Sequence, residues 1–311
     1  MTGKTEDAQI GGFLVGLAMK GESVTEIVAA AKVMRSLATE VHLNNPKHLV
    51  DTCGTGGGGL GLFNVSTACA FVVAAAGAQV AKHGNRSISS NSGSADVLEV
   101  AGVNLEMTPE AISQSIEKIG VGFMFAPAHH SAMKHAIGAR KSLAVRTIFN
   151  VLGPLTNPAK APCQVMGVYD KNLVEPIAKV LKSLGSKKVM VVHSKDGLDE
   201  ISIADDTFVA ELKEGKISTY TINPTDFGLS LGRLDDIKAD DAERSLVLIQ
   251  QALDGKKGTA KDIIALNAGA AIYVSGVVDS LQQGIDKAIE ILNSGAAHQK
   301  LDDFVKESTG C

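Results

Sequence analysis

The sequence contains no tryptophan, few other aromatic residues and no paired cysteine motif. Only 4% of its 311 residues are Phe, Trp or Tyr. The four cysteines, Cys53, Cys69, Cys163 and Cys311, are scattered without a Cys-x-x-Cys pair. This pattern favours reduced, mostly buried thiols over a zinc site or a disulfide framework. We therefore expect a cytoplasmic protein.

A strong net charge and a long apolar run are also missing. Lys and Arg number 30 and Asp and Glu number 34, for a net charge of -4. This balance gives no general attraction to nucleic acid or to an anionic membrane. The first residues, MTGKTEDAQ, lack the apolar core of a signal peptide. The longest uncharged run, residues 60–81, is interrupted by polar side chains and opens on glycines, which favours a buried helix over a membrane span.

Apolar periodicity predicts an α/β protein with a small helical part. Residues 5–41 have the pattern of two amphipathic helices, and Ile10, Phe13, Leu14 and Leu17 form the apolar stripe of the first. From residue 48 onward short apolar strands alternate with helices, which predicts a mostly parallel sheet covered on both faces. Strands are expected at HLVD, AQVAK, VGFMF, 163–169 and 187–193, a hairpin at 207–221, and helices at 64–77, 94–101, 109–119, 172–184, 240–254, 260–275 and 278–294.

The helical pattern at the start of the chain and the alternating strands and helices after it suggest two domains. A second helical patch, about residues 130–145, is followed by RTIFNVLGPLTNPAKAP, whose two Gly/Pro-rich turns are typical of a connection between domains. We expect a discontinuous small helical domain formed by residues 1–45 plus about 130–160. The larger α/β domain would comprise residues 46–129 plus about 161–311.

A glycine-rich loop is the first candidate site. In DTCGTGGGGLGLFNVST, residues 51–67, six glycines separate a strand from a helix. Such a loop leaves backbone N–H groups free to surround a phosphate at the start of a helix. Asn64, Ser66 and Thr67 add polar donors, although the same residues are ordinary helix caps.

The second candidate is KHGNRSISSNSGSAD, residues 82–96. Thirteen of its fifteen residues are polar or glycine, and it follows the next predicted strand. It could be a solvated loop with a serine cap. Two polar loops at successive strand ends favour the alternative, in which both line a polyphosphate site.

Two further segments are ambiguous on local grounds. Asp199 and Glu200, in HSKDGLDEIS, could hold a magnesium ion or could be a solvated acidic pair, with Asp196 as a turn residue. Arg140, beside Lys141, could pair with a substrate carboxylate or could be a solvated helix charge.

The ordered motifs DTCGTGGGG with FNVST, KHGNRSISSNSGSADVLE, FMFAPAHHSAMKH, FNVLGPLTNP and DGLDE resemble those of the anthranilate phosphoribosyltransferase family. The similarity extends from about residue 5 to the C-terminal helices. It implies transfer of the phosphoribosyl group of phosphoribosyl pyrophosphate to the amine of anthranilate, in tryptophan biosynthesis. It also implies a homodimer, a magnesium requirement with two ions per subunit, and a small helical domain beside a larger α/β domain.

The resemblance also assigns roles to individual residues. Asn85, Arg140 and Gly54 would contact anthranilate, and Ser66, Asp199 and Glu200 would bind magnesium. The residues that would contact the phosphoribosyl donor are Gly54, Gly57, Gly58, Leu62, Asn64, Val65, Ser66, Thr67, Lys82, His83, Gly84, Asn85, Arg86, Ser87, Ile88, Ser89, Ser90 and Ser94. Leaving pyrophosphate calls for fixed donors and a cation, so no side-chain nucleophile is expected and direct displacement is the expected mechanism.

Three departures from the family pattern stand out. Gly58 replaces a usual aspartate, and Leu62 replaces a common threonine. The family normally has a further helix or so before the segment that Met1 begins, so we expect somewhat weakened dimerisation. Two alternatives remain: a pyrimidine-nucleoside phosphorylase, and a nucleic-acid-binding relative that should show a basic groove.

Overall fold

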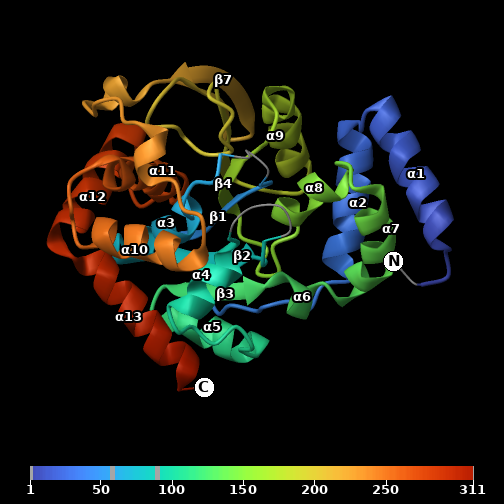
Figure 1. Cartoon of the computed structure of the whole chain (residues 1–311), viewed down its shortest axis with the longest axis horizontal. Helices are drawn as coiled ribbons and strands as arrows, with labels where there is room; N and C mark the ends of the chain where they lie inside the picture. Colours follow the sequence, from blue (N-terminus) through green and yellow to red (C-terminus); the bar gives the residue numbers. More distant parts are fainter. Residues whose placement is uncertain (1–2, 57–59, 88–91, 311) are drawn as a thin grey trace.

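The computed structural model describes residues 3–56, 60–87 and 92–310. A seven-stranded sheet lies at its centre, with the strand order β3-β2-β1-β4-β5-β6-β7 (Figure 1). The first five strands pair in parallel and the last two add an antiparallel hairpin, as expected. The strands are β1 (Leu49–Gly54), β2 (Gln79–Gly84), β3 (Val121–Phe125), β4 (Cys163–Gly167), β5 (Lys188–Ser194), β6 (Thr207–Lys213) and β7 (Lys216–Ile222).

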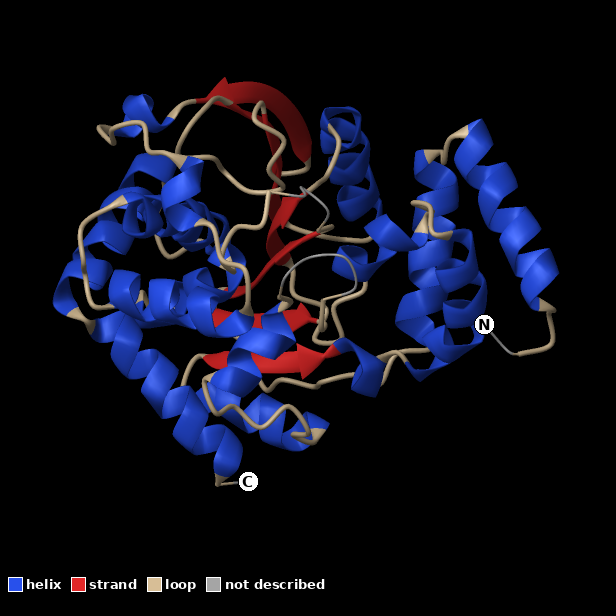
Figure 2. Ribbon diagram, in the orientation of Figure 1, coloured by secondary structure: helices blue, strands red, loops and turns tan. Residues whose placement is uncertain are grey.

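Helices cover the sheet on both sides because successive strand residues bury alternate faces (Figure 2). Val165 of β4 belongs to the core beneath α3 (Val65–Ala75), α11 (Thr259–Ser275) and α13 (Ala296–Thr309). Its neighbour Met166 belongs to the core beneath α2 (Val24–Ser36) and α9 (Val174–Ser183). The helices of the α/β part are α3 (Val65–Ala75), α4 (Ser94–Val100), α5 (Pro109–Lys118), α9 (Val174–Ser183), α10 (Ala242–Leu253), α11 (Thr259–Ser275), α12 (Leu281–Ser294) and α13 (Ala296–Thr309). Short 3₁₀ turns occupy η3 (Lys171–Leu173), η4 (Pro224–Phe227) and η5 (Leu234–Ile237).

The C-terminal helix α13 was absent from the sequence-based expectation. Its composition is largely polar, and its buried positions are Ala297, Leu301, Phe304 and Ser308. Only Phe304 among them is a large apolar side chain with no exposed surface, and it packs against Phe71 of α3. The burial of this helix is therefore decided by tertiary contacts more than by local periodicity.

A small helical domain stands at one side of the α/β part (Figure 1). Its second helix begins with a capping box, in which the hydroxyl of Ser23 accepts from the N–H of Glu26 while the Glu26 carboxylate accepts from the N–H of Ser23. The expected apolar stripe is wrong at Phe13, whose side chain is 67% exposed, while Leu14 and Leu17 are buried. Its first helices are α1 (Asp7–Lys20) and α2 (Val24–Ser36). The helical elements between β3 and β4 are α6 (Ala126–His129), η1 (Ser131–Met133), α7 (Lys134–Leu143), α8 (Phe149–Leu152) and η2 (Gly153–Leu155).

The strand order reverses beside β1, which lies between β2 and β4. Loops that leave the carboxyl ends of such strands separate to opposite faces and open a crevice, where ligands of open α/β sheets bind. Within the described residues, no helix is long and apolar enough to cross a membrane.

Candidate active site

An acidic loop is seated on the carboxyl ends of β1 and β4. A Cβ added to Gly54, at the end of β1, would overlap the carboxylate of Asp199. A Cβ on Gly167, at the end of β4, would overlap the backbone carbonyl of the same residue. The two glycines therefore let the loop approach the sheet more closely than any side chain would permit.

Asp199 and Glu200 are adjacent carboxylates in this loop. The N–H of Gly56 donates to Asp199 Oδ2 at 2.7 Å, which opposes the rise that burial imposes on the pKa of Asp199. Burial, and next the charge of Asp199, raise the pKa of Glu200 to about 8, against the opposing effect of Lys82. Asp199 and Glu200 are adjacent and partly buried, so a cation would favour the ionised form of both, and oxygen-only donors suit magnesium. The residues present therefore fit a magnesium ion.

Lys82 brings a buried positive charge to the same place. It is 3% exposed, and its Nζ donates to the carbonyl oxygen of Thr52 at 2.6 Å and to Ser66 Oγ at 3.2 Å. A small cavity adjoins these groups. Its lining residues are Thr52, Cys53, Ser66, Cys69, Val165, Glu200 and Asn267. The structure thus brings together Lys82, Ser66 and Glu200, which the sequence had separated.

The start of α3 is tied to two other segments. Asn64 Oδ1 accepts from Ser92 Oγ at 2.9 Å and from Ser245 Oγ at 2.8 Å. Val65 opens the helix as a buried residue. Leu62 lies just before it, in an isolated bridge with Lys238. Asn64 therefore connects the first loop to the second loop and to α10.

Thr67 is the next polar residue of this helix. Its hydroxyl is buried and has no hydrogen-bond partner among the described residues. The hydroxyl lies in the first turn of α3, which agrees with a ligand-binding role there.

The two ends of the second loop are held close together by hydrogen bonds. Asp96 Oδ2 accepts from the N–H groups of Ser87, at 2.9 Å, and Gly93, at 2.8 Å. A Cβ on Gly93 would overlap the backbone of residues 85–87, so this position requires glycine. Asp96 was not among the expected site residues, yet it fixes where the loop begins and ends.

The flanking residues of this loop point in different directions. Ser94 Oγ lies against Gly84 at the end of β2. Asn85 Oδ1 accepts from the N–H of Arg86 at 2.8 Å. The guanidinium of Arg86 instead forms two hydrogen bonds with Glu99, at 2.6 and 2.9 Å, so its charge is engaged by α4. Five of the expected residues lie outside the described ones: Gly57, Gly58, Ile88, Ser89 and Ser90.

The ring of His83 is fully engaged by the protein. Nδ1 lies 2.7 Å from Asp51 Oδ2 and Nε2 lies 2.7 Å from the carbonyl oxygen of Gly153. Burial disfavours charge on both partners, but their mutual attraction prevails: it raises the pKa of His83 and lowers the pKa of Asp51. Both ring nitrogens face acceptors, as in a charged imidazolium that donates twice. His83 therefore has no free nitrogen with which to accept a proton from a substrate.

Cys53 lies beside this pair. Ligand atoms of Asp51, Cys53 and His83 fall within 4.8 Å of one another, a spacing that could also hold a metal ion. The 2.7 Å hydrogen bond between Asp51 and His83 accounts for the arrangement without one. Gln164 completes the group by donating to the carbonyl oxygen of Pro154 at 2.7 Å.

Arg140 is carried by α7, in the helical domain. Its guanidinium stacks on the ring of Phe149, 5.2 Å from the centroid, and burial lowers its pKa. No carboxylate pairs with it in the part of the chain that the structure describes. A partly buried, unpaired guanidinium is suited to bind a planar carboxylate.

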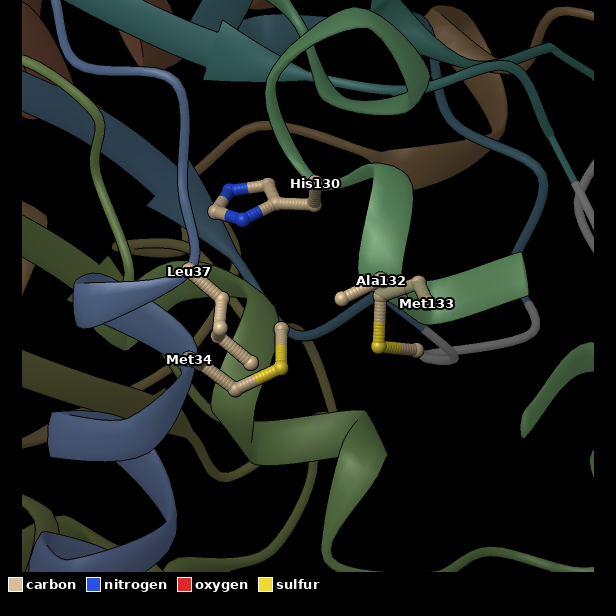
Figure 3. A pocket seen from close by; sticks show the side chains of 5 residues that line it. All are labelled: Met34, Leu37, His130, Ala132 and Met133. Atoms are coloured by element: carbon tan, nitrogen blue, oxygen red, sulfur yellow. The ribbon is translucent and has the colours of Figure 1, made fainter. Parts of the chain in front are cut away.

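His130 lies nearby in an apolar environment. Figure 3 shows its ring at a pocket whose other walls are Met34, Leu37, Ala132 and Met133. Burial, and then the charges of His83 and His129, lower the pKa of His130 to about 4. The ring is therefore neutral at physiological pH.

Several residues around the site were missed from the sequence. Gln164, Ser245 and Asn267 contact the strands and loops around the site, and they lie in segments that were assigned as ordinary strands or helices. Asn267 alone carried a local signal, since it interrupts the apolar run DIIALNAGAAIYV. The other contacts arise between segments distant in sequence.

Comparison with known proteins supports the same interpretation. The profile described as "Glycosyl transferase family, a/b domain" matches residues 46–298, and "Glycosyl transferase family, helical bundle domain" matches residues 1–38. A curated anthranilate phosphoribosyltransferase from Ruthia magnifica subsp. Calyptogena magnifica is 76% identical over 100% of this chain and 92% of its own length.

Solved structures agree. Anthranilate phosphoribosyltransferase from Thermus thermophilus is 41% identical, with a TM-score of 0.93 over 99% of this chain and 92% of that one. The Saccharomyces cerevisiae enzyme in complex with PRPP and Mg is 28% identical, with a TM-score of 0.89 over 98% of this chain and 86% of that one. The same yeast enzyme has also been solved with 4-fluoroanthranilate.

Proposed function

The chain belongs to the anthranilate phosphoribosyltransferase family, and on that premise we propose that it transfers the phosphoribosyl group of phosphoribosyl pyrophosphate (PRPP) to the amine of anthranilate. The products are N-(5-phosphoribosyl)anthranilate and pyrophosphate, in tryptophan biosynthesis. The observation that carries the proposal is the partly buried acidic pair Asp199 and Glu200, beside Lys82 at the reversal of strand order. The relatives favour this activity over a nucleoside phosphorylase or a nucleic-acid binder.

The donor binds, in this proposal, along the carboxyl ends of β1 and β2. Backbone N–H groups of the glycine loop and the start of α3 surround the pyrophosphate, and the buried Lys82 adds a fixed positive charge. Ser66 and Thr67 supply hydroxyls from the first turn of α3. The second loop, residues 82–94, forms the other wall.

Magnesium would be held by Asp199, Glu200 and Ser66, with two ions per subunit. Bound there, it would neutralise the charge that develops on the leaving pyrophosphate. The protein prepares the place by partly burying both carboxylates and by fixing Asp199 with the N–H of Gly56.

Anthranilate binds toward the helical domain. Arg140 pairs with its carboxylate, Asn85 contacts it from the second loop, and Gly54 contacts it at the end of β1. The amine of anthranilate is neutral at pH 7 and attacks the anomeric carbon directly. The engaged ring of His83 agrees with a reaction that needs no histidine base, so positioning of the two substrates supplies much of the rate.

The remaining features of the proposal concern the whole protein. The small helical domain comprises residues 1–45 plus about 130–160, and the α/β domain comprises residues 46–129 plus about 161–311. The protein is a cytoplasmic homodimer that binds neither membrane nor nucleic acid. Exposed apolar side chains on the helical domain, among them Phe13, Met19 and Val33, support a dimer contact there.

The test is the fluorescence of anthranilate. It should fall after addition of PRPP and Mg²⁺ to the purified protein, and it should stay constant when either is omitted. Asp199→Asn should abolish the decrease, while Lys195→Ala, in the exposed part of the same segment, should not. A constant signal with folded wild-type protein would contradict the proposed activity.

A further inference from the structure

A buried asparagine of α11 holds the backbone of the acidic loop. Asn267 Oδ1 accepts from the N–H of Ile201 at 2.8 Å, and its Nδ2 donates to the carbonyl oxygen of Ile201 at 2.9 Å. Both backbone groups of one residue are thus bound by one side chain. Ile201 directly follows Glu200, so this contact acts on the residue next to the acidic pair.

The amide itself is fixed by its own helix. Nδ2 of Asn267 also donates to the carbonyl oxygen of Ile263, one turn earlier, at 2.9 Å. Asn267 is 3% exposed, so water does not compete for these bonds. These hydrogen bonds fix the position of the peptide that follows Glu200 relative to α11.

The position of Asn267 relates it to the metal-binding groups. It lines the same small cavity as Glu200, Ser66 and Thr52. The other side of the loop is secured separately, where Asp196 Oδ2 accepts from Ser202 Oγ at 2.5 Å and Asp196 Oδ1 accepts from Ser194 Oγ. Asn267 therefore connects the acidic loop to the core helix α11.

This connection resists a movement that electrostatics would favour. Two adjacent, partly buried carboxylates repel each other and lose hydration, so turning them toward solvent would be favourable when no cation is bound. Hydrogen bonds to both backbone groups of Ile201 resist that rotation, because breaking them would leave buried polar groups without partners.

We propose that Asn267 is a positioning residue for magnesium: it fixes the Ile201 peptide so that Glu200 stays directed at the site shared with Asp199 and Ser66. The inference rests on the proposed function, since it takes these residues to be the magnesium ligands. Asn267 touches neither metal nor substrate in this role. It acts on metal affinity as outer hydrogen-bond partners of metal ligands do.

The experiment measures metal binding without catalysis. Mn²⁺ is titrated into the full-length protein in the presence of pyrophosphate, and free Mn²⁺ is followed by electron paramagnetic resonance. Asn267→Ala, and the milder Asn267→Ser, should weaken Mn²⁺ binding about tenfold or more. Steady-state rates should show a parallel rise in the Mg²⁺ concentration for half-maximal activity, with an unchanged KM for anthranilate at saturating Mg²⁺.

A control variant separates this role from general destabilisation. Ser275 lies on the same helix, is buried, and donates to the carbonyl oxygen of Ile272 at 2.7 Å. Ser275→Ala should leave Mn²⁺ affinity unchanged even if it lowers the melting temperature. Folded Asn267 variants that bind Mn²⁺ as tightly as the wild type would overturn the inference.

A further variant tests the premise. Asp199→Asn should weaken Mn²⁺ binding more than either substitution of Asn267. If Asp199→Asn binds Mn²⁺ as the wild type does, the proposed metal site itself is wrong. If Asp199→Asn weakens binding and the Asn267 variants do not, the metal site stands and the positioning role fails.

Discussion

At the scale of single residues, substitution of Arg140 distinguishes a role in binding anthranilate from a structural role. Its guanidinium stacks on Phe149 and pairs with no carboxylate among the described side chains. We expect Arg140→Ala to raise the KM for anthranilate about tenfold or more, since a charge-assisted pair is lost. The KM for PRPP should stay near its wild-type value. Steady-state kinetics with each substrate varied in turn give both constants.

The neighbouring Lys141 is a matched control for Arg140. It is exposed on the same helix, so Lys141→Ala should change neither constant. An equal rise in both constants for Arg140→Ala would instead assign the arginine a structural role.

The lowered pKa of His130 predicts that the free energy of unfolding depends on pH. Burial first, and then the neighbouring histidines, lower its pKa to about 4, below the value of about 6.5 in an unfolded chain. The unfolded state therefore takes up a proton before the folded state does. The neutral, buried state of His130 therefore leaves the free energy of unfolding unaffected above about pH 6.5. As the pH falls toward 4, the free energy of unfolding decreases by up to about 3 kcal/mol.

The measurement compares wild type with His130→Leu, which fits the pocket formed by Met34, Leu37 and Met133. Urea unfolding between pH 7.5 and 4.5 should give the variant a smaller loss of stability than the wild type. Parallel curves for the two proteins would show that His130 titrates normally in the folded state.

At the scale of elements, the end of β4 controls the acidic loop. A Cβ on Gly167 would overlap the carbonyl oxygen of Asp199, so Gly167→Ala must push the loop away from the sheet. We expect a destabilisation of about 1–3 kcal/mol, as for other overpacked sites, together with weakened Mg²⁺ dependence. Thermal melting with and without Mg²⁺ measures both effects.

Gly16, on α1, provides the contrast. A Cβ there meets nothing within 4 Å, so Gly16→Ala should stabilise the helix by about 0.5–1 kcal/mol and leave the Mg²⁺ response unchanged. If Gly167→Ala behaves in the same way, the loop does not depend on close contact with β4.

The elements themselves were largely predictable from the sequence, and their mutual contacts were not. Strands such as β5 and helices such as α11 have apolar patterns that local periodicity reveals. The contact between Asn267 and Ile201 joins residues 66 positions apart, and that between Ser245 and Asn64 joins residues 181 apart. Local sequence patterns do not determine how distant elements pack, so they cannot predict such contacts. For the same reason the engaged state of His83 became clear only in the structure.

At the scale of the whole molecule, the exposed apolar residues of the helical domain predict a dimer contact. Phe13 is 67% exposed and Val33 is 51% exposed. We expect the double variant Phe13→Glu, Val33→Glu to shift the protein from dimer to monomer, because burying two carboxylates in an apolar interface is costly. Sedimentation velocity over a range of concentrations measures the shift.

The matching control introduces a glutamate on a helix outside the proposed dimer contact. Val247, on α10, is 40% exposed, and Val247→Glu should leave the sedimentation coefficient unchanged. A wild-type protein that sediments as a monomer at micromolar concentration would contradict the proposed contact.

The insertion of α7 between β3 and β4 has a consequence for how this protein can change. In the proposed function, backbone groups and buried side chains such as Lys82 bind the donor at the carboxyl ends of inner strands, where substitution disturbs the core. Arg140 stands on a separate helix that contributes nothing to the sheet. Acceptor preference can thus drift or be selected in the laboratory while the activated sugar is handled as before. Libraries aimed at new aromatic amines should accordingly be confined to residues 134–149.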